Sequence, residues 1–151
     1  MKRLALALLL ALASGAVLRA EADVDSPANV TKAAYHSAMV HFGFSPETLK
    51  FEKKWLAPDL YARLLKKANQ PVPKGDAPDI EGDVILDCQD PPTSFAIGEA
   101  TIDGARAQVG VTLNWPGEVR HCVVLLKQID GVWKTVDIDF AKDGRLTDLL
   151  K

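Results

Sequence analysis

The chain has 151 residues and a formal net charge of −2 at neutral pH. This balance argues against a nucleic acid or an anionic membrane as the main partner, because no excess of basic residues is available to attract phosphate groups. The length fits one domain that buries a full hydrophobic core.

Residues 1–22 have the pattern of a secretory signal peptide. Lys2 and Arg3 precede an almost unbroken run of Leu and Ala over 4–13, and the triplet at 20–22 is Ala-Glu-Ala. The run is too short to span a bilayer, and Arg19 interrupts its end. We therefore predict cleavage after Ala22 and a periplasmic or secreted domain, residues 23–151, that is not inserted in the membrane. Removal of three basic residues and one acidic residue changes the net charge from −2 to −4.

The first half of the mature chain predicts three helices, over 26–42, 45–56 and 58–68. Ser-Pro pairs at 26–27 and 45–46 are start signals, because serine caps free N–H groups and proline fits the first turn. Pro58 opens the third helix, and Gly43 is expected to close the first in the left-handed conformation. Residues 70–83 contain three prolines and two glycines, which predicts a surface loop between a helical half and a strand half.

The second half predicts strands at 84–88, 94–102, 107–115, 119–127 and 132–140. Turn pairs Asp-Gly, Pro-Gly and Asp-Gly join the last four strands, and such short connections require antiparallel neighbours. The last strand is expected to alternate, with one set of residues facing the core and the other facing outward: Val132, Val136, Ile138 and Phe140 against Trp133, Thr135, Asp137 and Asp139. The fold class is therefore α+β, with N-terminal helices packed on a curved four- to five-stranded antiparallel meander.

The two cysteines, Cys88 and Cys122, both lie in the mature part. An even count in an oxidising compartment predicts a disulfide between them. A reactive thiol is disfavoured at Cys88, because the neighbouring anions Asp87 and Asp90 raise the thiol pKa. One cysteine per segment also falls short of the four ligands of a structural zinc site.

Two stretches together resemble a known family. They are GDVILDCQDPPTSFAIG at 82–98 and LLKQIDGVWKTVDIDF at 125–140. They are similar to exported bacterial domains of unknown function catalogued as DUF3828, within the NTF2-like, cystatin-like α+β superfamily. The resemblance covers about residues 30–140. It implies a cone-shaped sheet around a long helix with a pocket between them, and it supplies no catalytic residues to transfer.

No cofactor or metal is predicted from the residues that carry side-chain chemistry. His36 and His41 are five positions apart and point about 140° away from each other on a helix, so they do not chelate one ion. His121 projects to the sheet face opposite Cys122. The acidic loop at 79–83 lacks the glycine and the final glutamate of a calcium loop of the helix–loop–helix type, so we interpret it as solvated.

Three functional hypotheses follow from these features. The preferred one is a non-enzymatic binding module of the cell envelope that holds a small molecule or a protein partner, such as an enzyme it inhibits in the manner of an immunity protein. The alternative is a small isomerase or hydrolase with an acid–base pair drawn from Tyr35, His36, Asp137 and Asp139. The third is a homodimer through the open sheet face, which joint exposure of Trp115 and Trp133 would favour. The candidate pocket or surface-binding residues are Tyr35, His36, Asp90, Trp133, Asp137 and Asp139.

Overall fold

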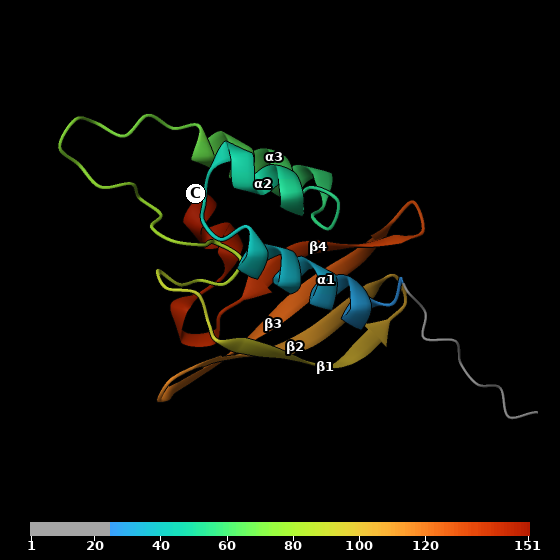
Figure 1. The fold of residues 1–151 in the computed structure, drawn as a ribbon. Helices are drawn as coiled ribbons and strands as arrows, with labels where there is room; N and C mark the ends of the chain where they lie inside the picture. The colour runs from blue at the N-terminus through green and yellow to red at the C-terminus, as the bar shows by residue number, and fades with distance from the viewer. Residues whose placement is uncertain (1–24) are drawn as a thin grey trace, which may run out of the picture.

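A computed structural model, which describes residues 25–151, has three helices followed by a four-stranded antiparallel sheet (Figure 1). The elements are α1 (Pro27–Val40), α2 (Pro46–Glu52), α3 (Pro58–Ala68), β1 (Ser94–Asp103), β2 (Arg106–Trp115), β3 (Glu118–Ile129), β4 (Val132–Asp139) and the 3₁₀ helices η1 (Ala141–Asp143) and η2 (Leu146–Leu150). The strands lie in the order β1-β2-β3-β4, which confirms the α+β class and the meander. The signal peptide predicted at residues 1–22 lies outside the described residues.

The helix start signals are confirmed. The Ser26 hydroxyl accepts the N–H of Asn29 at 3.3 Å, and the Ser45 hydroxyl accepts the N–H of Thr48 at 3.1 Å. The end of α1 differs from the prediction, because the helix stops at Val40 and not beside Gly43. Gly43 keeps a positive φ of 121° in the turn between α1 and α2, where its N–H donates to the Asp83 carboxylate.

The core lies between the helices and one sheet face, here called the inner face. Helix α1 packs along this face, and α2 and α3 lie next to α1 on the side of β4 (Figure 1). Side chains of Val109, Val111, Leu113, Val124, Leu126 and Ile138 from the strands meet Ala34, Tyr35, Leu60 and Leu64 from the helices. Burial of this apolar surface is the main term that stabilises the arrangement.

A bulge in β4 changes which side chains face the core. Thr135 pairs with Leu126 and Asp137 pairs with Leu125, so Val136 is an extra residue in the ladder. Trp133 and Thr135 consequently point inward and are buried, against the outward position predicted for them. Because Trp133 is buried, the exposed tryptophan pair that would favour a dimer through the sheet face is not present.

The edge of β4 is covered by the chain's own backbone. Thr135 donates its N–H to the carbonyl of Trp55 and accepts the N–H of Ala57, both at 2.8 Å. Further along the same edge, Asp139 forms an isolated bridge with Arg145. These contacts satisfy an edge that would otherwise expose unpaired N–H and C=O groups, and they fix the α2–α3 connection and the C-terminal segment against the sheet.

Residues 84–88 do not form the predicted fifth strand. They belong to a tight loop, 83–88, that we call the Asp83 loop. Its ends are joined by backbone hydrogen bonds between Asp83 and Cys88, and Asp87 has a positive φ of 49°. The apolar side chains within this loop are buried. A short run of buried apolar residues has the same sequence pattern whether it forms a strand or a loop, which is why a strand was predicted here.

Candidate functional site

Two adjoining hollows open where β3 begins, and Asp87, Glu118 and Arg120 line both of them. The apolar hollow has a volume of about 490 Å³ and the polar hollow about 480 Å³. Both are within the range of 300–1,000 Å³ that is usual for small-molecule sites. The Asp83 loop forms part of the wall of each, so its conformation determines the shape of both hollows.

The apolar hollow has a floor of four buried side chains. Leu86 comes from the Asp83 loop, Leu113 from β2, Cys122 from β3, and Phe140 from the position between β4 and η1. Each is less than a tenth exposed, so the floor reaches into the hydrophobic core. The rim is polar and includes Arg120, His121, Lys142 and Asp143. An apolar floor beneath a few polar groups is the usual chemistry of a small-molecule site.

Arg120 is held in place between the two hollows. Its Nη1 donates to the Asp87 carbonyl at 3.0 Å, and its Nε donates to a Glu118 oxygen at 2.5 Å. The guanidinium lies 5.1 Å from the centre of the Trp115 ring, whose Nε1 donates to the Asp90 carbonyl at 2.9 Å. Asp90 therefore contributes to the site through its backbone, which anchors the ring on which the guanidinium rests.

The charges around Arg120 are mainly negative. Burial raises the pKa of Asp87, the negative charge of Asp143 raises it further, and the Arg120 guanidinium lowers it. The hydrogen bond from Arg120 to Glu118 raises the guanidinium pKa, so the cation persists throughout the accessible pH range. The site thus presents the anchored Arg120 cation to a ligand, with Lys142 as a second cation on the rim, and the neighbouring carboxylates partly balance them.

The predicted disulfide is not formed in the structure, where Cys88 and Cys122 are both free thiols. Cys122 faces α1 from the inner face of β3, and its Sγ lies 3.1 Å from the Tyr35 hydroxyl. Cys88 lines the polar hollow instead. The even cysteine count predicts a disulfide, whereas the structure places Cys88 in the Asp83 loop and Cys122 in β3 without a bond between them.

The residues from which the alternative, enzymatic hypothesis drew its acid–base pair line neither of the two hollows. Tyr35 is buried against Cys122, and burial raises the pKa of its hydroxyl well above the usual value. His36 is exposed on α1. Asp137 and Asp139 lie at the edge of β4, where they contact the C-terminal segment. Trp133 belongs to the core.

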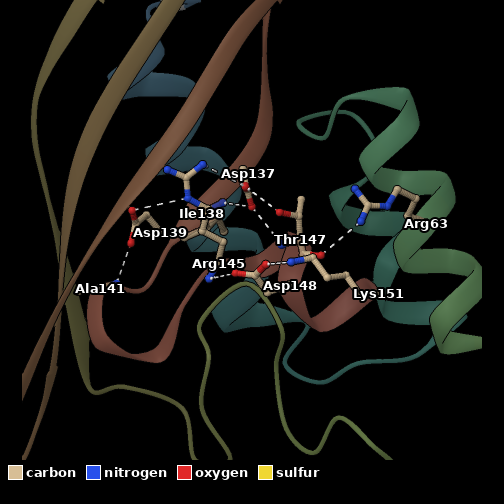
Figure 2. Close-up of polar contacts among 9 residues, drawn as sticks. All are labelled: Arg63, Asp137, Ile138, Asp139, Ala141, Arg145, Thr147, Asp148 and Lys151. Carbon is tan, nitrogen blue, oxygen red and sulfur yellow. Dashed lines mark hydrogen bonds and ion pairs between the residues drawn. The ribbon is translucent and has the colours of Figure 1, made fainter.

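Asp137 fastens the C-terminal segment to the sheet (Figure 2). Its carboxylate accepts the Thr147 N–H at 3.1 Å and the Thr147 hydroxyl at 2.9 Å. Arg145 lies 3.9 Å from Asp137 and 3.8 Å from Asp139, while Arg63 of α3 donates to the Thr147 carbonyl at 3.3 Å. These bonds hold η2 where its Leu146 side chain is fully buried, so the role of the carboxylate is structural.

We expect Asp137→Ala to lower the free energy of unfolding by about 2 kcal/mol, because buried hydrogen bonds to a charged group contribute roughly 1.5–3 kcal/mol. Amide exchange over residues 145–151 should accelerate at the same time. Asp139→Ala is the matched control, since its more exposed carboxylate should cost about 1 kcal/mol or less. Equal losses in the two variants, measured by urea unfolding, would contradict the structural role assigned to Asp137.

Gly82 allows the start of the Asp83 loop to pack closely against the backbone of Cys88 at its end. Its φ is +78°, and a Cβ at this position would lie 2.0 Å from the Cys88 carbonyl oxygen. Gly82→Ala should therefore cost about 2 kcal/mol and displace the loop, because a backbone atom is the obstacle. Gly131→Ala separates the cost of the positive φ from the cost of the steric clash, since Gly131 has the same φ of +78° and open space around it. Urea unfolding should show a smaller loss there, of about 1 kcal/mol.

Comparisons with protein-family models, with curated proteins and with solved structures find no match to this chain. Within residues 25–151, no group of three or more His, Cys, Asp or Glu side chains is arranged to hold a metal ion. In the same part of the chain, no helix has the length and apolar character needed to cross a membrane.

Proposed function

We propose that this chain is an exported binding module of NTF2-like type that accommodates a small, partly apolar molecule in the apolar hollow. The observation that carries the proposal is the floor of Leu86, Leu113, Cys122 and Phe140 beside the anchored Arg120 guanidinium. Helices packed on one face of an antiparallel meander support the NTF2-like part of the proposal.

The hollow favours a ligand with an apolar body and one hydrogen-bond acceptor. The floor would take up the apolar body, and the acceptor would bind Arg120. The guanidinium carries five N–H donors. Its contacts with the described residues use donors on Nε and Nη1, which leaves Nη2 for an oxygen of the ligand. Asp87 and Glu118 beside it would disfavour a ligand with several negative charges.

Native mass spectrometry of residues 23–151, purified gently from the compartment in which the chain occurs, is the first test of this proposal. A bound mass of a few hundred daltons is the expected result. A bound protein in its place would instead assign the chain to the inhibitor class and overturn the small-molecule proposal.

The dye 8-anilinonaphthalene-1-sulfonate tests the position of the site, because it combines aromatic rings with one sulfonate. Arg120→Gln should weaken its binding about tenfold, the equivalent of losing one charged hydrogen bond. Lys127→Gln is the matched control, since Lys127 is an exposed cation on the same strand and lines neither hollow. Equal affinities in the two variants would place the dye outside the hollow and contradict the proposal.

A further inference from the structure

Glu52, the last residue of α2, is buried without a hydrogen-bond partner. It is 5% exposed, and among the described residues neither carboxylate oxygen has a partner within hydrogen-bonding geometry. Buried polar groups are nearly always paired, so an unpaired carboxyl group needs an explanation. The cost of burying a charge is avoided when the group takes up a proton. Accordingly, burial is the largest influence on Glu52, and it raises the carboxyl pKa to about 7.

Three neighbouring groups act on Glu52, each from a different segment. The negative charge of Asp83 raises the Glu52 pKa. Lys54, just beyond α2, lowers it, as does the Ser37 hydroxyl of α1, which lies close by but outside hydrogen-bonding geometry. Of these neighbours, only Asp83 belongs to the loop that lines the two hollows.

Asp83 joins that loop to the helices. Its Oδ2 accepts the Gly43 N–H at 3.2 Å, from the turn between α1 and α2. Its Oδ1 accepts the N–H groups of Ile85 and Leu86 at 2.8 and 2.9 Å. Burial raises the Asp83 pKa to about 6, although these three N–H groups lower it. Leu86 therefore occupies the floor of the apolar hollow through a bond made by the same carboxylate whose negative charge raises the Glu52 pKa.

We propose that Glu52 and Asp83 form a proton-controlled pair that regulates the apolar hollow: protonated Glu52 keeps the Asp83 loop closed, and loss of its proton releases the loop. The physical step is a second negative charge placed in a buried site beside the Asp83 carboxylate. Moving the loop away from α2 separates the charges and admits water to Glu52. The regulatory meaning of this step rests on the proposed function of the hollow as a binding site.

Two further titratable groups act on or respond to Asp83, namely Tyr35 and Cys88, and both remain neutral over the pH range in which the pair acts. Burial raises the Tyr35 pKa well above its usual value, and Asp83 raises it further. The Cys88 pKa is raised to about 12, first by burial and then by Asp83. Neither group therefore gains a charge between pH 6 and 8. Asp87, in the same loop, has a pKa raised by burial, and it is present in the wild type and in every Glu52 variant alike.

Amide hydrogen exchange at pH 6 and pH 8, corrected for intrinsic rates, tests the pair without a ligand. The amides of Gly43, Ile85 and Leu86 report local opening if they are less protected than Val124 in the sheet, which reports global unfolding. In the wild-type protein this local opening should increase about tenfold between the two pH values, as linkage predicts for a pKa that falls from about 7 to an ordinary value on opening.

In Glu52→Gln, local opening at these three amides should not increase between pH 6 and pH 8. Glu52→Met is a second neutral variant, for use if the glutamine side chain disturbs packing. Asp83 titrates in both variants as it does in the wild type, so the difference isolates Glu52. Protection that is independent of pH in the wild type, or that changes equally in a folded neutral variant, would overturn the proposal.

Binding of 8-anilinonaphthalene-1-sulfonate at the same two pH values separates this proposal from the proposed function. Affinity that depends on Arg120 and falls up to tenfold from pH 6 to pH 8 supports both. Arg120-dependent affinity with no loop opening would overturn the proton-controlled pair and leave the binding function standing. Loop opening without Arg120-dependent binding at either pH would overturn the binding function and the regulatory role that rests on it.

Discussion

At pH 6, where protonated Glu52 keeps the Asp83 loop closed, the Cys88 thiol should react with the neutral reagent 2,2′-dipyridyl disulfide about 50 times more slowly than the same thiol in the unfolded chain. Burial, with a further contribution from Asp83, raises the Cys88 pKa from 9.0 to about 12, which lowers the thiolate fraction at pH 6 about 1,000-fold. A more basic thiolate is also more nucleophilic, by about 20-fold for this shift. The net retardation is therefore about 50-fold.

Release of 2-thiopyridone, followed by its absorbance, measures this rate, and Cys122→Ser isolates Cys88 from the second thiol. Cys122 should react more slowly still in the wild type, because it is buried against Tyr35. A rate at Cys88 equal to that of the unfolded chain would mean that the Asp83 loop leaves the thiol open to water. A mature chain two hydrogens lighter than the dithiol would restore the disulfide predicted from the cysteine count.

Features governed by local backbone chemistry were predictable from the sequence. Both serine caps lie where the Ser-Pro pairs indicated, and Asp130 and Gly131 have the positive φ values expected of a tight hairpin turn. The four long strands lie within two residues of their predicted bounds. Caps and turns are decided by a few adjacent residues, so a single sequence contains the information that specifies them.

Features governed by contacts between distant segments were not predictable in the same way. The bulge at Val136 depends on the register between β3 and β4, and a strict alternation of side chains cannot reveal an extra residue. Residues 84–86 are apolar because they are buried within a loop, which periodicity does not distinguish from a short buried strand. The separation of Cys88 and Cys122 in the structure could not be predicted for the same reason, since residue counts contain no distances.

The candidate site was only partly visible in the sequence. Asp90 lies at the polar hollow, as a residue that anchors Trp115 through its carbonyl. Arg120 and Glu52 were missed, because an isolated arginine in a strand and a glutamate at a helix end look like ordinary surface residues. The direction of the Arg120 side chain could have been predicted. Residues two positions apart in a strand point to the same sheet face, so Arg120 points to the same face as Cys122. No local pattern marks the burial of Glu52.

Glu52→Gln should remove a pH-dependent loss of stability of about 3 kcal/mol. A carboxyl group whose pKa is about 7 in the folded state and 4.5 in the unfolded state holds its proton more tightly when folded. Its contribution to stability is therefore complete below pH 4.5, declines as the pH rises from 4.5 to about 7, and is lost above that, at 1.36 kcal/mol per pKa unit. Asp83 acts with the same sign between its ordinary pKa of 3.8 and about 6, but it is present in both proteins.

The measurement is urea unfolding of the wild type and Glu52→Gln at pH 4 and pH 8. The variant's stability relative to the wild type should rise by about 3 kcal/mol between the two pH values, whatever the glutamine costs at pH 4. Glu47→Gln, at an exposed position of the same helix, is the control and should show no such change. If the two variants respond to pH alike, the Glu52 carboxyl is hydrated in the folded protein, and the proton-controlled pair has no energetic basis.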